Sequence, residues 1–244
     1  MSGHSKWHNI QERKGKQDAK RANLFTKYAK GITVAAQKGG GDANMNFTLR
    51  LAVEKARAVG MPKDNIDRAI KRGTGEIAGE RMEEIFYEAF GPGGVAILIK
   101  AVTDNKNRTV SDLKHALNQA GGSLGGPGSV SYLFEQAGVI VILDLRFPLV
   151  GLQTRDDFEL AMIEAGAEDI TAAGAEIEIK TKFENFQPVL KKLKEFGVEP
   201  KESAVRWIAQ SKVAVDKDVE AKLLELFSAL EAHDDVEDYF TNAE

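Results

Sequence analysis

The sequence predicts a multidomain α+β protein, with an N-terminal helical domain and two α/β sandwich domains of ferredoxin-like type, one inserted into the other. Three observations support this prediction. Apolar residues repeat at helical spacing over the first 79 positions, strand-like and helix-like segments alternate from residue 95 onward, and glycine-rich turns separate many of them. The chain has 244 residues, 43% of them hydrophobic, which is enough to build cores without disulfide staples.

The N-terminal domain is expected to contain three helices. From Asp18 the pattern is helical, with apolar side chains at spacings i, i+3, i+4 and i+7 from Phe25 onward, and a glycine triplet, residues 39–41, ends this helix. Two shorter helices are expected over residues 46–59 and 62–72. Residues 1–16 are polar and basic with little periodicity, so we expect them to form an arm in front of the first helix.

The remainder of the chain alternates between strands and helices. The expected segments are strand 95–102, helix 109–119, strands 130–134 and 139–145, helix 156–165, strands 169–171 and 175–181, helix 186–196, strand 203–211, helix 217–232 and strand 236–240.

This order fits two arrangements of the α/β part. One is a tandem of two domains, and the other is a domain in two halves that flank an insert. We favour the second, because each part then completes a sheet covered by helices on one face, if residues 198–200 add an edge to the insert. It divides the chain into a helical domain of residues 1–79, an outer domain of residues 80–136 and 203–244, and an inserted domain of residues 137–202.

Several classes of site are excluded or disfavoured by composition. The chain has no cysteine, which excludes disulfides, iron–sulfur clusters and thiol nucleophiles. His4 and His8 are spaced i, i+4 but have no carboxylate partner nearby, so no metal site is expected. Neither a nucleophile elbow nor a P-loop motif is present, and we expect no enzyme activity and no cofactor.

The N-terminus lacks the apolar core of a signal peptide, and no apolar run approaches the roughly 18 to 20 residues that span a membrane. We therefore expect a cytoplasmic protein with no membrane partner. The sequence carries no signal of oligomeric state.

Charge is distributed unevenly along the chain. Residues 1–82 carry 17 Lys and Arg against 8 Asp and Glu, whereas residues 83–244 carry 16 against 29. The whole chain has a formal net charge of −4, which conceals this difference. A basic N-terminal third on an acidic body indicates a module that binds a polyanion, while the acidic domains would orient the complex or meet a protein partner.

A nucleic-acid-binding surface is therefore predicted on the arm and the helical domain. Lysine and arginine neutralise phosphates and release counterions, and an aromatic side chain can stack on an exposed base. The predicted binding residues are Lys6, Trp7, Arg13, Lys14, Lys16, Lys20, Arg21, Lys27, Lys30, Arg68, Lys71 and Arg72. The alternative for this cluster is an ordinary solvated charged surface.

The polar loop between the strand at 95–102 and the following helix could hold an anion. Asn105, Asn107 and Arg108 lie next to the predicted helix N-terminus, where backbone N–H groups attract negative charge. The same residues could equally form a capped turn. The glycine-rich segments at 91–94 and 121–128 are better explained as tight turns than as phosphate-binding loops.

Ordered motifs along nearly the whole chain resemble the YebC/PmpR family. These motifs are at residues 3–7, 17–21, 25–27, 39–41, 61–66, 68–73, 87–88, 91–94, 103–105, 107–109, 121–122, 128–130 and 165–169. The resemblance implies three domains, one inserted in another, and no catalytic activity. It also implies a DNA-binding transcriptional regulator, although relatives include a mitochondrial translational activator and proteins linked to the ribosome.

Two functions follow as alternatives. The first is DNA binding with transcriptional control, and the second is binding to ribosomal RNA with translational control. Charge does not separate them, because both polyanions satisfy it. The sequence shows neither a convincing helix-turn-helix nor an aromatic pair of the kind that RNA-binding sheets use.

Overall fold

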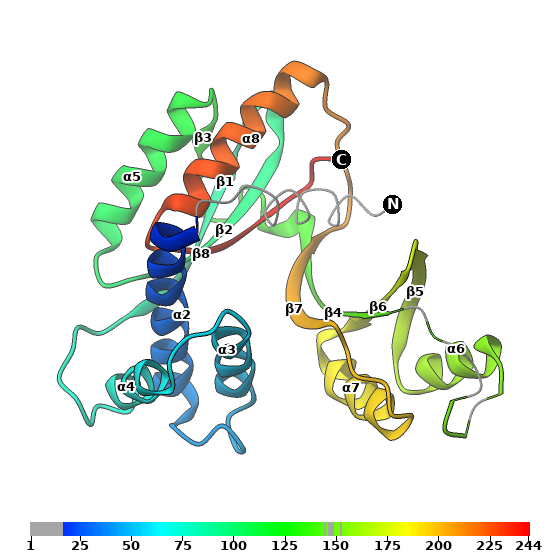
Figure 1. The fold of residues 1–244 in the computed structure, drawn as a ribbon. Coiled ribbons are helices and arrows are strands. Elements are labelled where there is room, and N and C mark those ends of the chain that lie inside the picture. Colours follow the sequence, from blue (N-terminus) through cyan, green and yellow to red (C-terminus); the bar gives the residue numbers. More distant parts are fainter. Residues whose placement is uncertain (1–16, 144, 146–148, 152) are drawn as a thin grey trace. The chain divides into compact units, whose positions relative to one another are not determined.

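The computed structural model describes residues 17–143, 145, 149–151 and 153–244. The fold is mixed α+β, as predicted, with two four-stranded antiparallel sheets (Figure 1). The described chain divides into two compact units: residues 134–210, and the segments before and after them. Within the described residues, no helix combines the length and the apolar composition needed to cross a membrane.

The first part of the larger unit is a helical module. Its helices are α2 (Gln17–Gly39), α3 (Phe47–Ala58) and α4 (Lys63–Gly73). Their apolar faces meet in a core that includes Ile32, Leu49 and Ile66. The observed boundaries lie within two residues of the predicted ones, because apolar periodicity, glycine and proline all mark these helices.

The second part of the larger unit is a sheet in the order β3-β1-β2-β8, with helices packed on one face. The strands are β1 (Glu83–Phe90), β2 (Ala96–Thr103), β3 (Ser123–Leu124) and β8 (Val236–Thr241), with a short 3-10 turn at Pro92–Gly94. Helices α5 (Lys106–Gln119) and α8 (Lys217–Ala232) lie side by side on the sheet (Figure 1). Their buried core includes Ile97, Leu113 and Phe227.

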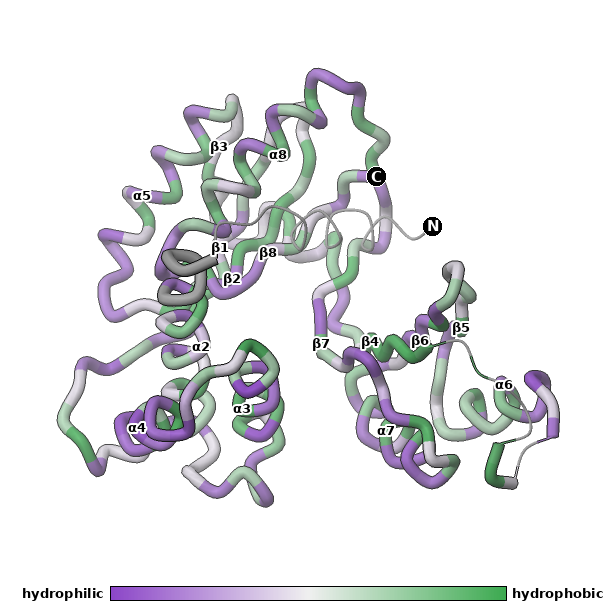
Figure 2. Tube along the Cα trace, in the orientation of Figure 1, coloured by the Kyte–Doolittle hydropathy of each residue, from purple (hydrophilic) through white to green (hydrophobic). Residues whose placement is uncertain are grey.

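The smaller unit, residues 134–210, contains the sheet β5-β6-β4-β7. Its elements are β4 (Phe134–Leu143), α6 (Arg155–Glu164), β5 (Ala167–Ala173), β6 (Glu176–Lys182), a 3-10 turn at Phe183–Asn185, α7 (Phe186–Glu195) and β7 (Glu202–Ala209). Strand β4 is the long hydrophobic segment of this unit (Figure 2), and on β6 only alternate residues, among them Ile177 and Ile179, are buried.

Three expectations for the strands differ from the structure. Strand β1 was not predicted. The strands expected at 130–134 and 139–145 are instead a 3-10 turn at Ser131–Leu133 followed by the single strand β4. The strand expected at 203–211 is β7, which pairs with β4 from Phe134↔Ala209 to Val141↔Glu202.

The pairing of β7 also changes the expected division of the chain. The prediction assigned this strand to the outer domain, whose sheet is completed instead by β1 and β3. Residues 198–200 add no edge strand to the smaller unit, because β7 already occupies that edge next to β4. The difference arises because neither β1 nor β3 shows a clear strand pattern in the sequence, so the prediction fills the outer sheet with the segments at 130–134 and 203–211 in their place.

Candidate nucleic-acid interface

The helical module holds α4 against α2 through close backbone contact. A Cβ added at Gly73 would lie 2.3 Å from the carbonyl oxygen of Thr33 and 2.7 Å from the Cβ of Ala36, so only glycine fits there. The Thr33 hydroxyl donates to the carbonyl oxygen of Ala69 at 3.1 Å. These contacts fix the orientation of α4, with Ile66 and Ala69 buried and the polar side facing away from α2.

The outward sides of α3 and α4 carry six exposed cations. They are Lys55, Arg57, Lys63, Arg68, Lys71 and Arg72. Within the described part of the chain, no ion pair involves any of these side chains. Figure 2 shows α4 as a mostly hydrophilic segment. The predicted residues Arg68, Lys71 and Arg72 thus lie on a surface where their charges remain available to an external anion.

The other three cations were not singled out from the sequence. Lys55 and Arg57 lie at the end of α3, and Lys63 begins α4 just after the Gly60–Pro62 connection. For Lys55, the signal that could have found it is its position on the side of α3 away from the apolar stripe formed by Leu49, Val53 and Ala56.

Lys27 and Lys30 require a correction, because the structure uses both inside the protein. The Lys30 ammonium lies 2.6 Å from the Asp235 carboxylate, and the two side chains are only 16% and 3% exposed. The Lys27 ammonium donates to the carbonyl oxygen of Glu231 at 2.5 Å, and burial lowers its pKa. Both lysines join α2 to the end of α8, where helix carbonyls and carboxylates attract a cation, and they are not part of an exposed phosphate-binding surface.

Asp235 is the centre of this internal network. Its carboxylate accepts hydrogen bonds from the hydroxyls of Thr103 and Thr109, at 3.2 and 2.8 Å, and from Arg108 at 3.1 Å, in addition to Lys30. Burial raises the pKa of Asp235, but the hydrogen bonds and the Lys30 charge outweigh it and hold the pKa at about 2. Asp235 is therefore ionised at neutral pH and links α2, β2, α5 and β8.

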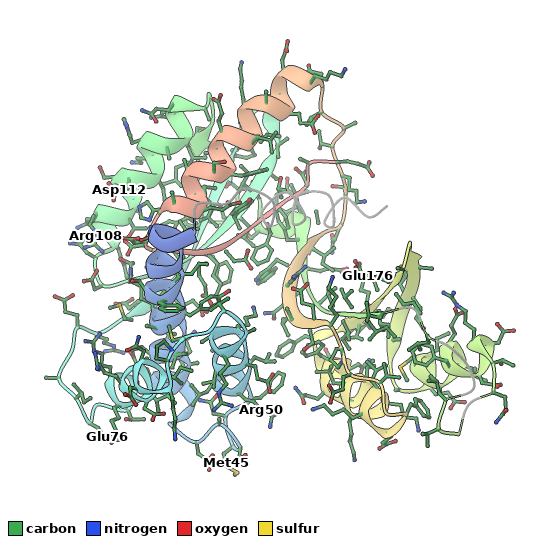
Figure 3. The ribbon with its side chains drawn as sticks, viewed as in Figure 1. Met45, Arg50, Glu76, Arg108, Asp112 and Glu176 are labelled. Atoms are coloured by element: carbon green, nitrogen blue, oxygen red, sulfur yellow. The ribbon has the colours of Figure 1, made fainter. Side chains whose placement is uncertain are left out.

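The predicted anion-binding loop is a capped turn. The Asn105 side chain accepts from the backbone N–H of Arg108 at 3.1 Å and thereby caps α5. The Arg108 guanidinium bonds Asp104 at 2.7 Å as well as Asp235. Asn105 and Arg108 have structural roles, because the side chains of both already have partners. Asn107 is exposed, and its side chain has no hydrogen-bond partner among the described residues. Figure 3 labels Arg108 beside this network.

The glycine-rich segment at 121–128 is likewise organised by the protein itself. The Glu88 carboxylate accepts three backbone N–H groups, from Gly128 and Val130 at 2.6 Å and from Ser131 at 2.7 Å. Burial raises the pKa of Glu88, but these bonds lower it below its ordinary value. The protein's own carboxylate thus accepts the hydrogen bonds from the backbone N–H groups that a bound phosphate would need.

The arm lies outside the described residues. Lys6, Trp7, Arg13, Lys14 and Lys16 belong to it, so their predicted role stays a prediction. Lys20 and Arg21 lie in α2, but their side chains are also outside the described part. In the described chain, no group of three His, Asp or Glu side chains is arranged to hold a metal ion.

Comparison with known proteins finds similarity over nearly the full length. A family model for the TACO1/YebC protein N-terminal domain matches residues 5–76, and one for the TACO1/YebC second and third domain matches residues 82–243. A "probable transcriptional regulatory protein" of Maridesulfovibrio salexigens is 48% identical over 244 residues, which are 100% of this chain and 96% of that protein.

A second relative of the same description, from Thermotoga maritima, is 49% identical over 245 residues, covering 100% of this chain and 94% of the relative. Among solved structures, the crystal structure of a conserved hypothetical protein from Aquifex aeolicus matches with a TM-score of 0.81 and 38% identity. The match covers 96% of this chain and 95% of that one.

Proposed function

The chain belongs to the TACO1/YebC family, and from this membership and its exposed cations we propose a non-enzymatic regulator that binds DNA and controls transcription. The resemblance drawn from the sequence motifs is thus confirmed at the level of the family. The names of the relatives point to a regulatory role. Binding to DNA is our proposal.

The observation that carries the proposal is the set of unpaired cations on α3 and α4. These helices carry seven basic and three acidic residues over positions 47–73, and six of the cations are exposed without an ion pair in the described chain. Releasing condensed counterions from phosphates favours binding at such a surface, and this contribution is independent of base sequence. Lys6, Arg13, Lys14 and Lys16 from the arm, and Lys20 and Arg21 from the start of α2, would add further phosphate contacts.

Charge reversal on α4 tests the proposal. In an Arg68→Glu, Lys71→Glu variant, affinity for duplex DNA should fall at least about tenfold at one fixed salt concentration. The slope of log affinity against log salt should become shallower by roughly two, because two phosphate contacts are lost. The matched control is Lys191→Glu, Lys194→Glu on α7, which changes the net charge equally at two exposed lysines of the smaller unit.

Mobility shift with duplex DNA and co-sedimentation with ribosomes, at the same salt concentration, separate the two predicted targets. The proposal expects the α4 variant to lose DNA binding while the α7 variant keeps it. Equal losses in both variants would mean that net charge, not this surface, drives binding. Ribosome binding without DNA binding in the wild-type protein would replace transcriptional control with the translational alternative.

A further inference from the structure

Met45 is the most exposed large apolar side chain of the described residues, at 86%. It lies at the tip of the connection between α2 and α3, where Figure 3 shows it pointing away from the helices. Exposing an unbranched apolar side chain so fully forfeits the burial that normally stabilises it. The position is notable because the surrounding loop is tightly organised.

Buried hydrogen bonds hold this loop in one conformation. Asn46, only 7% exposed, donates from its amide nitrogen to the carbonyl oxygens of Ala35 and Gly40, both at 2.8 Å. Its amide oxygen accepts from the backbone N–H of Leu49 at 3.1 Å and caps α3. A Cβ at Gly39 would come within 2.6 Å of the Asn46 side chain. The hydrogen bonds of Asn46 thus fix the conformation of the loop at the residue that follows Met45.

Within the loop itself, Asp42 fixes the turn that precedes Met45. Its carboxylate accepts from the backbone N–H of Asn44 at 2.9 Å, and its carbonyl oxygen accepts from Met45 at 3.1 Å and from Asn46 at 2.8 Å. The side chain of Met45 therefore projects from a short turn that is held by its own hydrogen bonds, and not from a flexible linker.

Cations border the loop on two sides. A Cβ at Gly41 would lie 2.9 Å from the Thr74 side chain and 3.2 Å from that of Ile70, so the loop abuts the end of α4, where Lys71 and Arg72 are exposed. On the other side, Arg50 lies in the first turns of α3 with its guanidinium 5.2 Å above the Phe47 ring. Acidic residues near these cations along the chain are Glu54, Asp67 and Glu76, and Asp42 lies in the loop itself.

We propose that Met45 is an apolar contact for an unstacked nucleobase, held in place while the cations of α3 and α4 bind the flanking phosphates. A thioether is polarisable and packs well on aromatic rings, and methionine is among the side chains that proteins insert between base steps. The inference rests on the proposed function. It adds that this surface prefers a nucleic acid with a base out of the stack, whether in DNA or in RNA.

The test compares two oligonucleotide duplexes that differ only by one unpaired nucleotide, at one salt concentration. The wild-type protein should bind the bulged duplex about three- to tenfold more tightly than the paired one, the size of a single sulfur–aromatic contact. Met45→Gln, of similar shape but polar, should bind both duplexes alike, and Met45→Leu should keep the preference. The salt slope should be unchanged in both variants. Running DNA and RNA duplexes in parallel distinguishes the source of the base.

Leu160→Ala is the matched control, because Leu160 is an exposed apolar side chain, 59% exposed, in the smaller unit. It should leave the preference for the bulge intact. The inference is overturned if the wild-type protein shows no preference, or if Met45→Gln keeps it. The α4 charge-reversal variant separates the two proposals, since it should weaken binding to both duplexes whatever Met45 does.

Discussion

Asp235 shows how one residue can join segments that are distant in sequence. The carboxylate holds Lys30 from α2, Arg108 and Thr109 from α5 and Thr103 from β2. A buried carboxylate with these partners stabilises the fold only while it is ionised, because protonation removes the charge that the lysine and arginine neutralise.

The stability contributed by Asp235 should therefore depend on pH. Its pKa of about 2 in the folded protein lies below the ordinary value of 3.8. A depressed pKa stabilises the fold above pH 4, and this contribution is lost as the pH falls toward 2. We expect Asp235→Asn to lower the free energy of unfolding by about 2 kcal/mol at pH 7, with a difference that shrinks steadily from pH 4 to pH 2.

Denaturant unfolding at pH 7, 4, 3 and 2.5 measures this difference. Asp112→Asn is the control, because Asp112 is half exposed and lies 3.4 Å from His233. It should change the free energy of unfolding by less than about 0.5 kcal/mol. A destabilisation by Asp235→Asn that is as large at pH 2.5 as at pH 7 would show that the negative charge is not the cause.

The sequence alone does not predict which charged residues form contacts of this kind. Lys30 and Lys71 are the same residue type on amphipathic helices, yet one is buried against a carboxylate 205 positions away and the other is exposed. Nothing local distinguishes them, since the partner is supplied by the tertiary fold. The excess of basic residues therefore predicted a binding surface, but it could not say which cations remain free.

At the scale of elements, helices were predicted better than strands. The helix boundaries are encoded locally by apolar spacing and by glycine or proline. Strand β1 reads EEIFYEAF, with apolar side chains on both faces and acids among them, so it shows no clean alternation. The strand expected at 139–145 starts only after Gly138, whereas β4 starts at Phe134. The missing side chain of Gly138 makes room for Phe186, where a Cβ would come within 2.4 Å.

The contact between α2 and α4 gives a prediction at this scale. Alanine favours a helix over glycine by about 1 kcal/mol, so Gly73→Ala would stabilise α4 if space allowed. Because the Cβ would lie 2.3 Å from the Thr33 carbonyl oxygen, we expect a net destabilisation of about 2 kcal/mol. Hydrogen exchange in α4 should become faster, and denaturant unfolding measures the free energy.

Gly79→Ala is the comparison for this prediction. A Cβ there meets only the Arg72 side chain, at an ordinary 3.7 Å, so the variant should unfold like the wild-type protein. If Gly73→Ala is as stable as the wild type, the backbones of α2 and α4 can separate without cost. The close approach would then not be what orients the cations of α4.

At the scale of the whole molecule, the uneven charge has two uses. Part of the basic N-terminal charge is paired within the protein. Lys27 and Lys30 bind groups at the end of α8 and just after it, and Lys38 pairs with Glu84 at 3.0 Å. Six other cations are exposed on α3 and α4. The acidic excess of residues 83–244 thus fastens the helical module to the sheet that follows it, and also disfavours phosphate contact elsewhere.

The pairing of β4 with β7 predicts that the smaller unit can be removed. Phe134 and Ala209 are direct partners in the ladder, so the chain enters and leaves this unit on neighbouring strands about 5 Å apart. All four strands of its sheet, and helices α6 and α7, lie within residues 134–210. Its buried side chains include Phe158, Met162 and Phe186.

We therefore expect residues 134–210, expressed alone, to unfold in one cooperative transition. We also expect a chain in which a linker of about three Gly and Ser residues replaces residues 134–209 to keep its fold, because the sheet β3-β1-β2-β8 is complete without them. Circular dichroism during denaturant unfolding measures both. The shortened chain should bind duplex DNA with the affinity and salt slope of the full chain, since every cation of α3 and α4 is retained. An unfolded shortened chain would mean that the larger unit depends on the smaller one, and a folded chain with weakened binding would move part of the interface into residues 134–209.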